Sequence, residues 1–123
     1  EADTIIPNSL EVGTRIVPGL NSVAFSTTPA FDLSKGNIQQ FSCTTAGSTI
    51  SPTFTNLTRG ELMTLIFVQN STTACTVSWP SNVHGAMIVS ATLSGVNTQQ
   101  FMVSNAGTDL YAVGPTGMTG GKP

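Results

Sequence analysis

Few side chains in this sequence could carry out chemistry, and those few are far apart along the chain. The 123 residues include two cysteines, one histidine and six carboxylates. Catalysis needs groups that converge and can change protonation state, so a nucleophile and base would have to be Cys43 or Cys75 with His84. Both cysteines stand in alternating segments, where cysteine is usually a core residue. We therefore predict that the protein is not an enzyme and has no catalytic residues.

The carboxylates and the remaining motifs point to no cofactor. Spacing alone does not exclude a glycosidase pair, since carboxylates distant in sequence can meet in space. However, Glu61 follows Gly60 at a strand start and Asp109 follows Gly107 in a turn, both usual places for solvated residues. One histidine and two cysteines are too few for a zinc site, and no phosphate-binding or calcium loop is present. We expect neither a metal nor a cofactor.

Trp79 and His84 are the residues most suited to a small surface patch, because they lie close together around Pro80. Trp79 is also in the inward phase of an alternating segment, which is typical of a core or subunit-interface residue. The alternation favours the structural role, and the surface patch is the alternative.

Charge is sparse: four Lys or Arg and six Asp or Glu, for a formal net charge of −2. No basic patch is available to hold phosphates, so we expect no nucleic-acid partner. No apolar run reaches the roughly 18 residues of a membrane span, so we expect no membrane partner. Ser and Thr make up 32 residues, which keeps strand surfaces polar without charge and favours extended backbone.

Short strands must position these side chains. Segments with strand character are residues 22–25, 30–33, 37–44, 53–56, 61–69, 74–79, 99–104 and 109–113. Their spacing, with Ser, Thr, Gly and Asn between them, predicts an all-β fold, an antiparallel β-sandwich or jelly roll, over residues 21–113. Residues 61–69 are apolar on both faces, which predicts a central strand covered on both sides. We expect its most buried residues to include Leu62, Leu65, Ile66, Phe67 and Val68.

The two ends of the chain differ from this body. Residues 1–20 contain prolines at 7 and 18 and four of the ten charges, which favours an extended N-terminal arm that wraps a neighbour. Residues 114–123 place Gly114, Gly117 and Gly120 at the three-residue spacing of a collagen triple helix. A Gly/Pro-rich disordered tail is the alternative, and three triplets are too few to fold alone.

Four segments of the body, in this order, resemble a β-domain common in bacteriophage fibre and virion-surface proteins. They are Gly60-Glu-Leu-Met-Thr-Leu-Ile-Phe-Val-Gln69, Thr76-Val-Ser-Trp-Pro80, Gln99-Gln-Phe-Met-Val103 and Asp109-Leu-Tyr-Ala-Val113. The resemblance spans about two thirds of the chain and implies a trimeric β-domain that serves as a fibre segment or knob. The sequence departs from the pattern at residues 83–86, Val-His-Gly-Ala, which puts a shared surface site in doubt.

These features together predict a structural protein of a bacteriophage particle, most simply a trimeric capsid decoration or head-fibre protein. We expect it on the virion surface after assembly in the host cytoplasm, bound to itself as a homotrimer and to the major capsid protein through its N-terminal arm. The alternative is a tail-fibre or tail-spike module for host receptor binding. Because a particle assembled in the cytosol stays reduced, we predict that Cys43 and Cys75 are unlinked, although a disulfide would form if their strands were neighbours.

Overall fold

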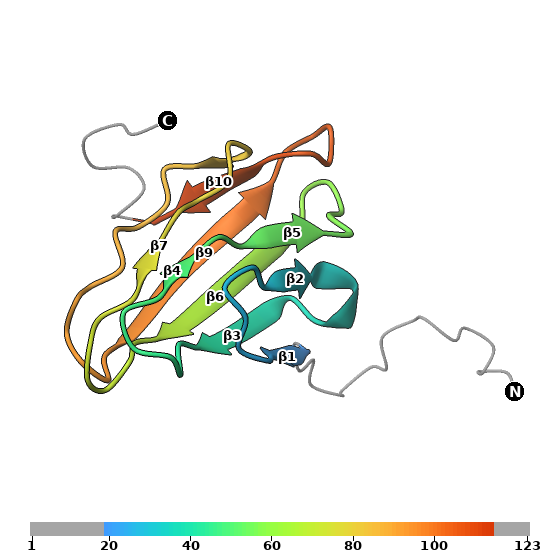
Figure 1. The fold of residues 1–123 in the computed structure, drawn as a ribbon. Coiled ribbons are helices and arrows are strands. Elements are labelled where there is room, and N and C mark those ends of the chain that lie inside the picture. The colour runs from blue at the N-terminus through green and yellow to red at the C-terminus, as the bar shows by residue number, and fades with distance from the viewer. Residues whose placement is uncertain (1–18, 115–123) are drawn as a thin grey trace, which may run out of the picture.

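Short β-strands and one 3-10 helix are the regular elements of the computed structural model, which describes residues 19–114 (Figure 1). In chain order the elements are β1 (Leu20–Val23), β2 (Ala30–Asp32), the 3-10 helix η1 (Leu33–Lys35), β3 (Ile38–Ser42), β4 (Thr49–Ile50), β5 (Thr53–Thr55), β6 (Leu62–Val68), β7 (Thr76–Val77), β8 (Val83–His84), β9 (Val96–Val103) and β10 (Leu110–Val113). The predicted all-β class is confirmed. The short strands β4 and β8 were not expected.

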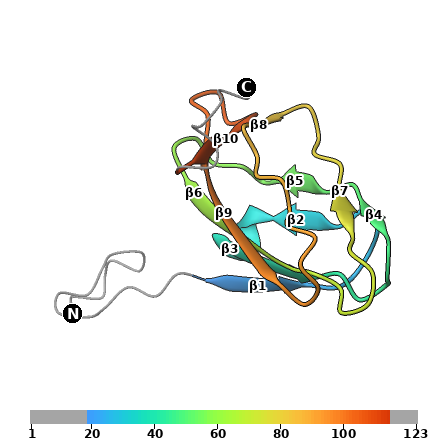
Figure 2. The same cartoon turned by 90° about the vertical axis from the view of Figure 1, so that its left-hand side faces the viewer.

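The chain winds in a solenoid-like manner. The main sheet has the order β1-β3-β6-β9-β10-β8, and its first three strands are parallel. Two further parallel pairs, β2 with β5 and β4 with β7, lie on the other side of the core (Figure 2). Antiparallel pairing, expected throughout, is found between β6, β9 and β10. A sandwich or jelly roll is therefore not confirmed, because side-chain alternation identifies a strand but not the direction of its partner.

In the core, phenylalanines from one coil of the chain stack on those from the next, where a coil is one passage from the main sheet to the covering strands and back. Phe31 of β2 lies opposite Phe54 of β5, with ring centroids 5.3 Å apart. Phe41 of β3 lies opposite Phe67 of β6, with centroids 5.7 Å apart. An edge-to-face contact between Phe31 and Phe41 joins the two stacks. These rings fill the space between the main sheet and the strands that cover it.

Strand β6 is covered on one face only, which corrects the expectation for this segment. Leu65 and Phe67 are buried as predicted, but Leu62 is 41% exposed. Ile66 and Val68 are half-buried. The strand alternates because β2, β5, β4 and β7 pack on one side of the sheet, and none of the described residues covers the other side. The apolar run in the sequence therefore marks a buried face and an outward apolar face.

A buried glutamine holds the turn between β6 and β7. The Nε2 group of Gln69 donates hydrogen bonds to the carbonyls of Cys75 and Ser90, both at 3.0 Å. Its Oε1 atom accepts from the backbone N–H groups of Asn70 and Cys75. Buried polar groups are costly unless paired, and here one side chain satisfies four backbone groups.

Cys43 and Cys75 form a disulfide, so the prediction of two unlinked thiols is wrong. The Sγ atoms are 2.08 Å apart and the two Cα atoms are 6.6 Å apart. Cys43 directly follows β3 and Cys75 directly precedes β7, and both are buried. The strand alternation correctly indicated burial, but the coiled path of the chain also makes the two residues neighbours.

We expect the native protein to resist thiol alkylation when no reductant is added. The bridge closes a loop with a sequence separation of 32, which predicts a stabilisation of about 4 kcal/mol by restricting the unfolded chain. Intact mass measurement should show no alkylated cysteine, and urea unfolding with and without reductant should differ by about this free energy. Two alkylated cysteines in the folded protein would contradict the bridge.

Replacement of Gln69 by Met should destabilise the fold by about 3 kcal/mol, because it leaves four backbone groups without their partner, three of them in the buried residues Asn70 and Cys75. Gln99 is a matched control: it is also buried, but it binds only two backbone groups, the carbonyls of Gln100 and Val113, and its Oε1 atom has no partner. Gln99→Met should therefore cost about 1 kcal/mol. Urea denaturation measures both, and equal losses would contradict the role assigned to Gln69.

Candidate functional site

The candidate site is the side of the main sheet away from the core, called the outer face. The register of the six strands defines it. It consists of Leu20 and Ser22 of β1, Ile38, Gln40 and Ser42 of β3, Leu62, Thr64, Ile66 and Val68 of β6, Val96, Thr98, Gln100 and Met102 of β9, Tyr111 and Val113 of β10, and His84 of β8.

Apolar side chains gather on the outer face. The described residues expose eight large hydrophobic side chains, and six of them lie here: Leu20, Leu62, Val96, Met102, Tyr111 and Val113. Leu62, Met102 and Tyr111 are opposite one another on neighbouring strands, so they form a continuous row. Scattered apolar residues need no explanation, whereas a contiguous exposed patch marks an interaction site. The sequence analysis missed this face because it assigned Leu62, Ile66 and Val68 to the core.

Formal charges are absent from the outer face. None of its residues is Asp, Glu, Lys or Arg. The charged residues within 19–114 are in η1 and its cap, the β5–β6 loop and the β9–β10 loop: Asp32, Lys35, Arg59, Glu61 and Asp109. These three segments lie at the same end of the molecule in Figure 1. The opposite end consists of loops rich in Ser, Thr, Gly and Ala.

The described chain enters and leaves the main sheet in the same direction. β1, β3 and β6 are parallel, and β10 is antiparallel to β9, which is antiparallel to β6. β10 therefore runs parallel to β1, from the charged end toward the opposite end. Gly114 follows Val113 of the outer face, and a Cβ added to Gly114 would meet nothing within 4 Å. Gly117 and Gly120, like the rest of the predicted tail and most of the predicted arm, lie outside the described residues.

His84 joins the outer face at the β8–β10 edge. Its Nε2 atom is 2.8 Å from Oδ2 of Asp109, and its ring stacks on Tyr111 with centroids 4.8 Å apart. Hydrogen bonds from the side chains of His84 and Thr108 lower the pKa of Asp109 below its ordinary value. The carboxylate beside the outer face is thus already paired within its own chain.

Trp79 does not share a surface with His84. Its ring lies on the core side of the sheet, 6.0 Å from the ring of Phe101, and its Nε1–H donates to the carbonyl of Met87 at 3.2 Å. This position fits the structural role, while His84 belongs to the other side of the β9–β10 hairpin. Trp79 also lines an apolar cavity of about 320 Å³ with Met87 and Ile88.

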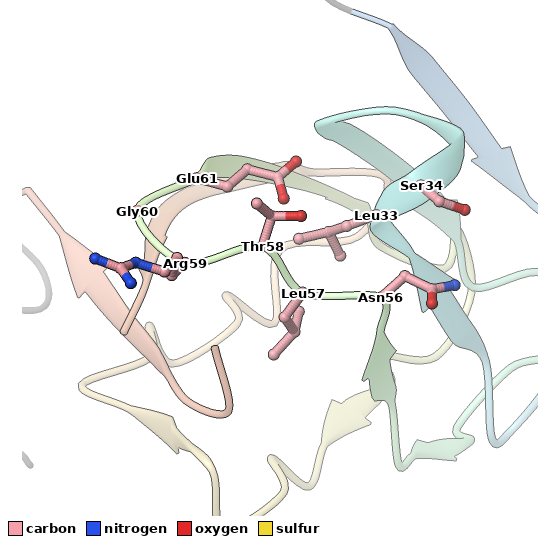
Figure 3. Close-up of a pocket in the computed structure, with 8 residues that line it drawn as sticks. All are labelled: Leu33, Ser34, Asn56, Leu57, Thr58, Arg59, Gly60 and Glu61. Carbon is pink, nitrogen blue, oxygen red and sulfur yellow. The ribbon is translucent and has the colours of Figure 1, made fainter. Parts of the chain in front are cut away.

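A second hollow, of about 610 Å³, lies between η1 and the β5–β6 loop (Figure 3). Burial raises the pKa of Glu61, and a backbone hydrogen bond from Thr58 partly opposes this shift. The guanidinium of Arg59 points away from Glu61 in Figure 3. Aliphatic and polar side chains line the hollow, and no aromatic ring is among them. It lacks the stacking surface that sugar recognition usually requires.

Comparison with protein-family models, with curated proteins and with solved structures found no match for this chain. Within residues 19–114, no three His, Cys, Asp or Glu side chains are grouped so that they could hold a metal ion. The same residues contain no helix long and apolar enough to cross a membrane.

Replacement of His84 by Ala should raise the pKa of Asp109 toward 3.8, because the largest cause of its depression is removed. A carboxylate whose pKa is lower in the folded protein than in the unfolded chain stabilises the fold when the pH is above its pKa in the unfolded chain. This stabilisation disappears as the pH falls through the pKa that the group has in the folded protein. Carboxyl NMR titration measures the shift. Asp32, whose pKa is lowered by Ser34 and Asn56, is the internal control and should not change.

Proposed function

We propose that this chain is a non-enzymatic structural protein of a bacteriophage particle. In this proposal it is a trimeric capsid decoration or head-fibre protein that attaches to the shell through residues 1–20. The observation that carries the proposal is the common direction of β1 and β10. In a module with this path the first strand starts at the charged end and the last strand runs away from that end, which suits a projecting virion protein.

The segments that carry the resemblance to phage virion-surface domains form one connected part of the fold. The first contains β6, the second contains β7, and the last two belong to β9 and β10. β6 pairs with β9, and β9 pairs with β10. The four segments therefore make up the last coil and the hairpin that closes it, so their order in the sequence has a structural basis.

The disulfide and the charge distribution support a location on the particle surface. Disulfides persist in oxidising surroundings such as the virion exterior, and the bridge joins two successive coils of the body. The charged residues near the start of β1 offer polar groups for a contact with the shell next to the arm. The uncharged end of the molecule would then face outward.

A tail-fibre module for host receptor binding is the second candidate, and one observation favours it. Ser71, Thr72 and Thr73 are all exposed in the β6–β7 loop, at the end toward which β10 runs. Such a loop could contact host glycans through hydroxyl groups. The absence of an aromatic ring around the larger hollow counts against this candidate.

Binding to separated particle components tests the proposal. The full chain should bind heads of the phage that encodes it, and a chain without residues 1–18 should lose this binding while it keeps the oligomeric state of the full chain. Cosedimentation with purified heads and purified tails measures both variants. Binding to tails alone would support the receptor-binding alternative, and head binding that survives the truncation would contradict anchorage by the arm.

A further inference from the structure

We propose that the outer face is the surface through which three copies of this chain associate, around a threefold axis that runs parallel to the strands. This inference depends on the proposed function only for the number of copies. It assigns the interface to particular residues of β6, β9 and β10, and it identifies the occupant of the outer face as the same face of two further copies.

The absence of charge makes the outer face suited to a copy of itself. A surface that meets its own copy places like charges near one another, and a buried charge without a partner costs several kcal/mol. None of the outer-face residues is Asp, Glu, Lys or Arg. Asp109, the nearest carboxylate along β10, is hydrogen-bonded to His84 of its own chain.

The exit of the chain supports three copies rather than two. Tyr111 and Val113 belong to the outer face, and Gly114 begins the Gly-Pro-Thr-Gly-Met-Thr-Gly sequence directly after them. The glycine spacing of a triple helix has a structural use only where three chains meet. If three outer faces surround one axis parallel to the strands, the three Gly114 residues leave the bodies in the same direction. Association of the bodies would thus bring the tails together.

The outer face is modest in extent for self-association. The strands β1, β3, β6, β9 and β10 cover about 440 Å² of flat area, at about 3.3 Å per residue and about 4.8 Å between strands. Three copies bring together about 1,300 Å² of flat area, shared among three pairwise contacts, so each contact is smaller than the roughly 1,200–2,000 Å² of a standard interface. The assembly would therefore depend on all three contacts closing around the axis. Thr98 and Gln100, between the apolar residues, can form hydrogen bonds across the contact.

Single charges placed on and off the outer face test this proposal in the full chain. Thr98→Lys and Met102→Lys each add a charge at an exposed outer-face position, so the monomer should still fold. Thr55→Lys, at an exposed position of β5, and Ile88→Lys, at a position 94% exposed, are the matched controls away from this face. Circular dichroism establishes folding of each variant, and sedimentation equilibrium gives its mass.

The wild-type chain and both controls should sediment at three times the 12.7 kDa chain mass. The two outer-face variants should sediment at the mass of one chain. Deletion of residues 114–123 should leave the trimer intact, because three triplets are too few to hold it.

Other outcomes separate this inference from the proposed function. A wild-type trimer that survives both outer-face changes would place the interface elsewhere and overturn the inference alone. Dissociation of the trimer by the two control substitutions as well would also overturn it. So would a trimer that survives the outer-face substitutions but dissociates when residues 1–18 are removed. A wild-type dimer would exclude the threefold arrangement, and a wild-type monomer would overturn the proposed homotrimer together with this interface.

Discussion

In-register stacking of phenylalanines between parallel coils is the interaction on which the rest of the structure depends. Phe31 on Phe54 and Phe41 on Phe67 are equivalent positions of successive coils, so each turn of the chain is aligned by its aromatic residues. Because side chains alternate along a strand, the inward direction of Phe41 and Phe67 sends their neighbours outward. The composition of the outer face is thus a consequence of the register that the core imposes.

The antiparallel hairpin of β9 and β10 ends the coiled arrangement and connects it to the proposed assembly. A coiled sheet that stopped at β6 would leave a seven-residue edge open to further pairing. β9 covers this edge along the whole of β6, and β10 then returns the chain parallel to β1. One element therefore protects the sheet, extends the outer face and sets the direction in which the chain leaves the body.

Much of the local structure could be predicted from the sequence, but the winding could not. Alternation correctly indicated that Cys43 and Cys75 are buried. The internal repeat escaped notice because its period is uneven: opposite residues are 23 positions apart for Phe31 and Phe54, and 26 for Phe41 and Phe67. The same oversight hid the disulfide, since Cys43 and Cys75 become neighbours only when the coils are stacked. The surface patch of Trp79 with His84, which the sequence offered as the alternative to a structural role for Trp79, does not form, because the two residues lie on opposite sides of the sheet.

The distribution of charge explains how so polar a composition can leave an apolar surface. Ser and Thr occupy many of the loop and strand positions where other proteins place Lys and Glu, so the polar surface carries few charges. Polar but unionised groups such as Thr64 and Thr98 lie between apolar neighbours on the outer face, and they lose little when a copy covers them, provided that hydrogen bonds form across the contact. The few ionised groups among residues 19–114 occupy turns at one end. In the proposed assembly, anchorage, self-association and projection would therefore use separate surfaces of one small fold.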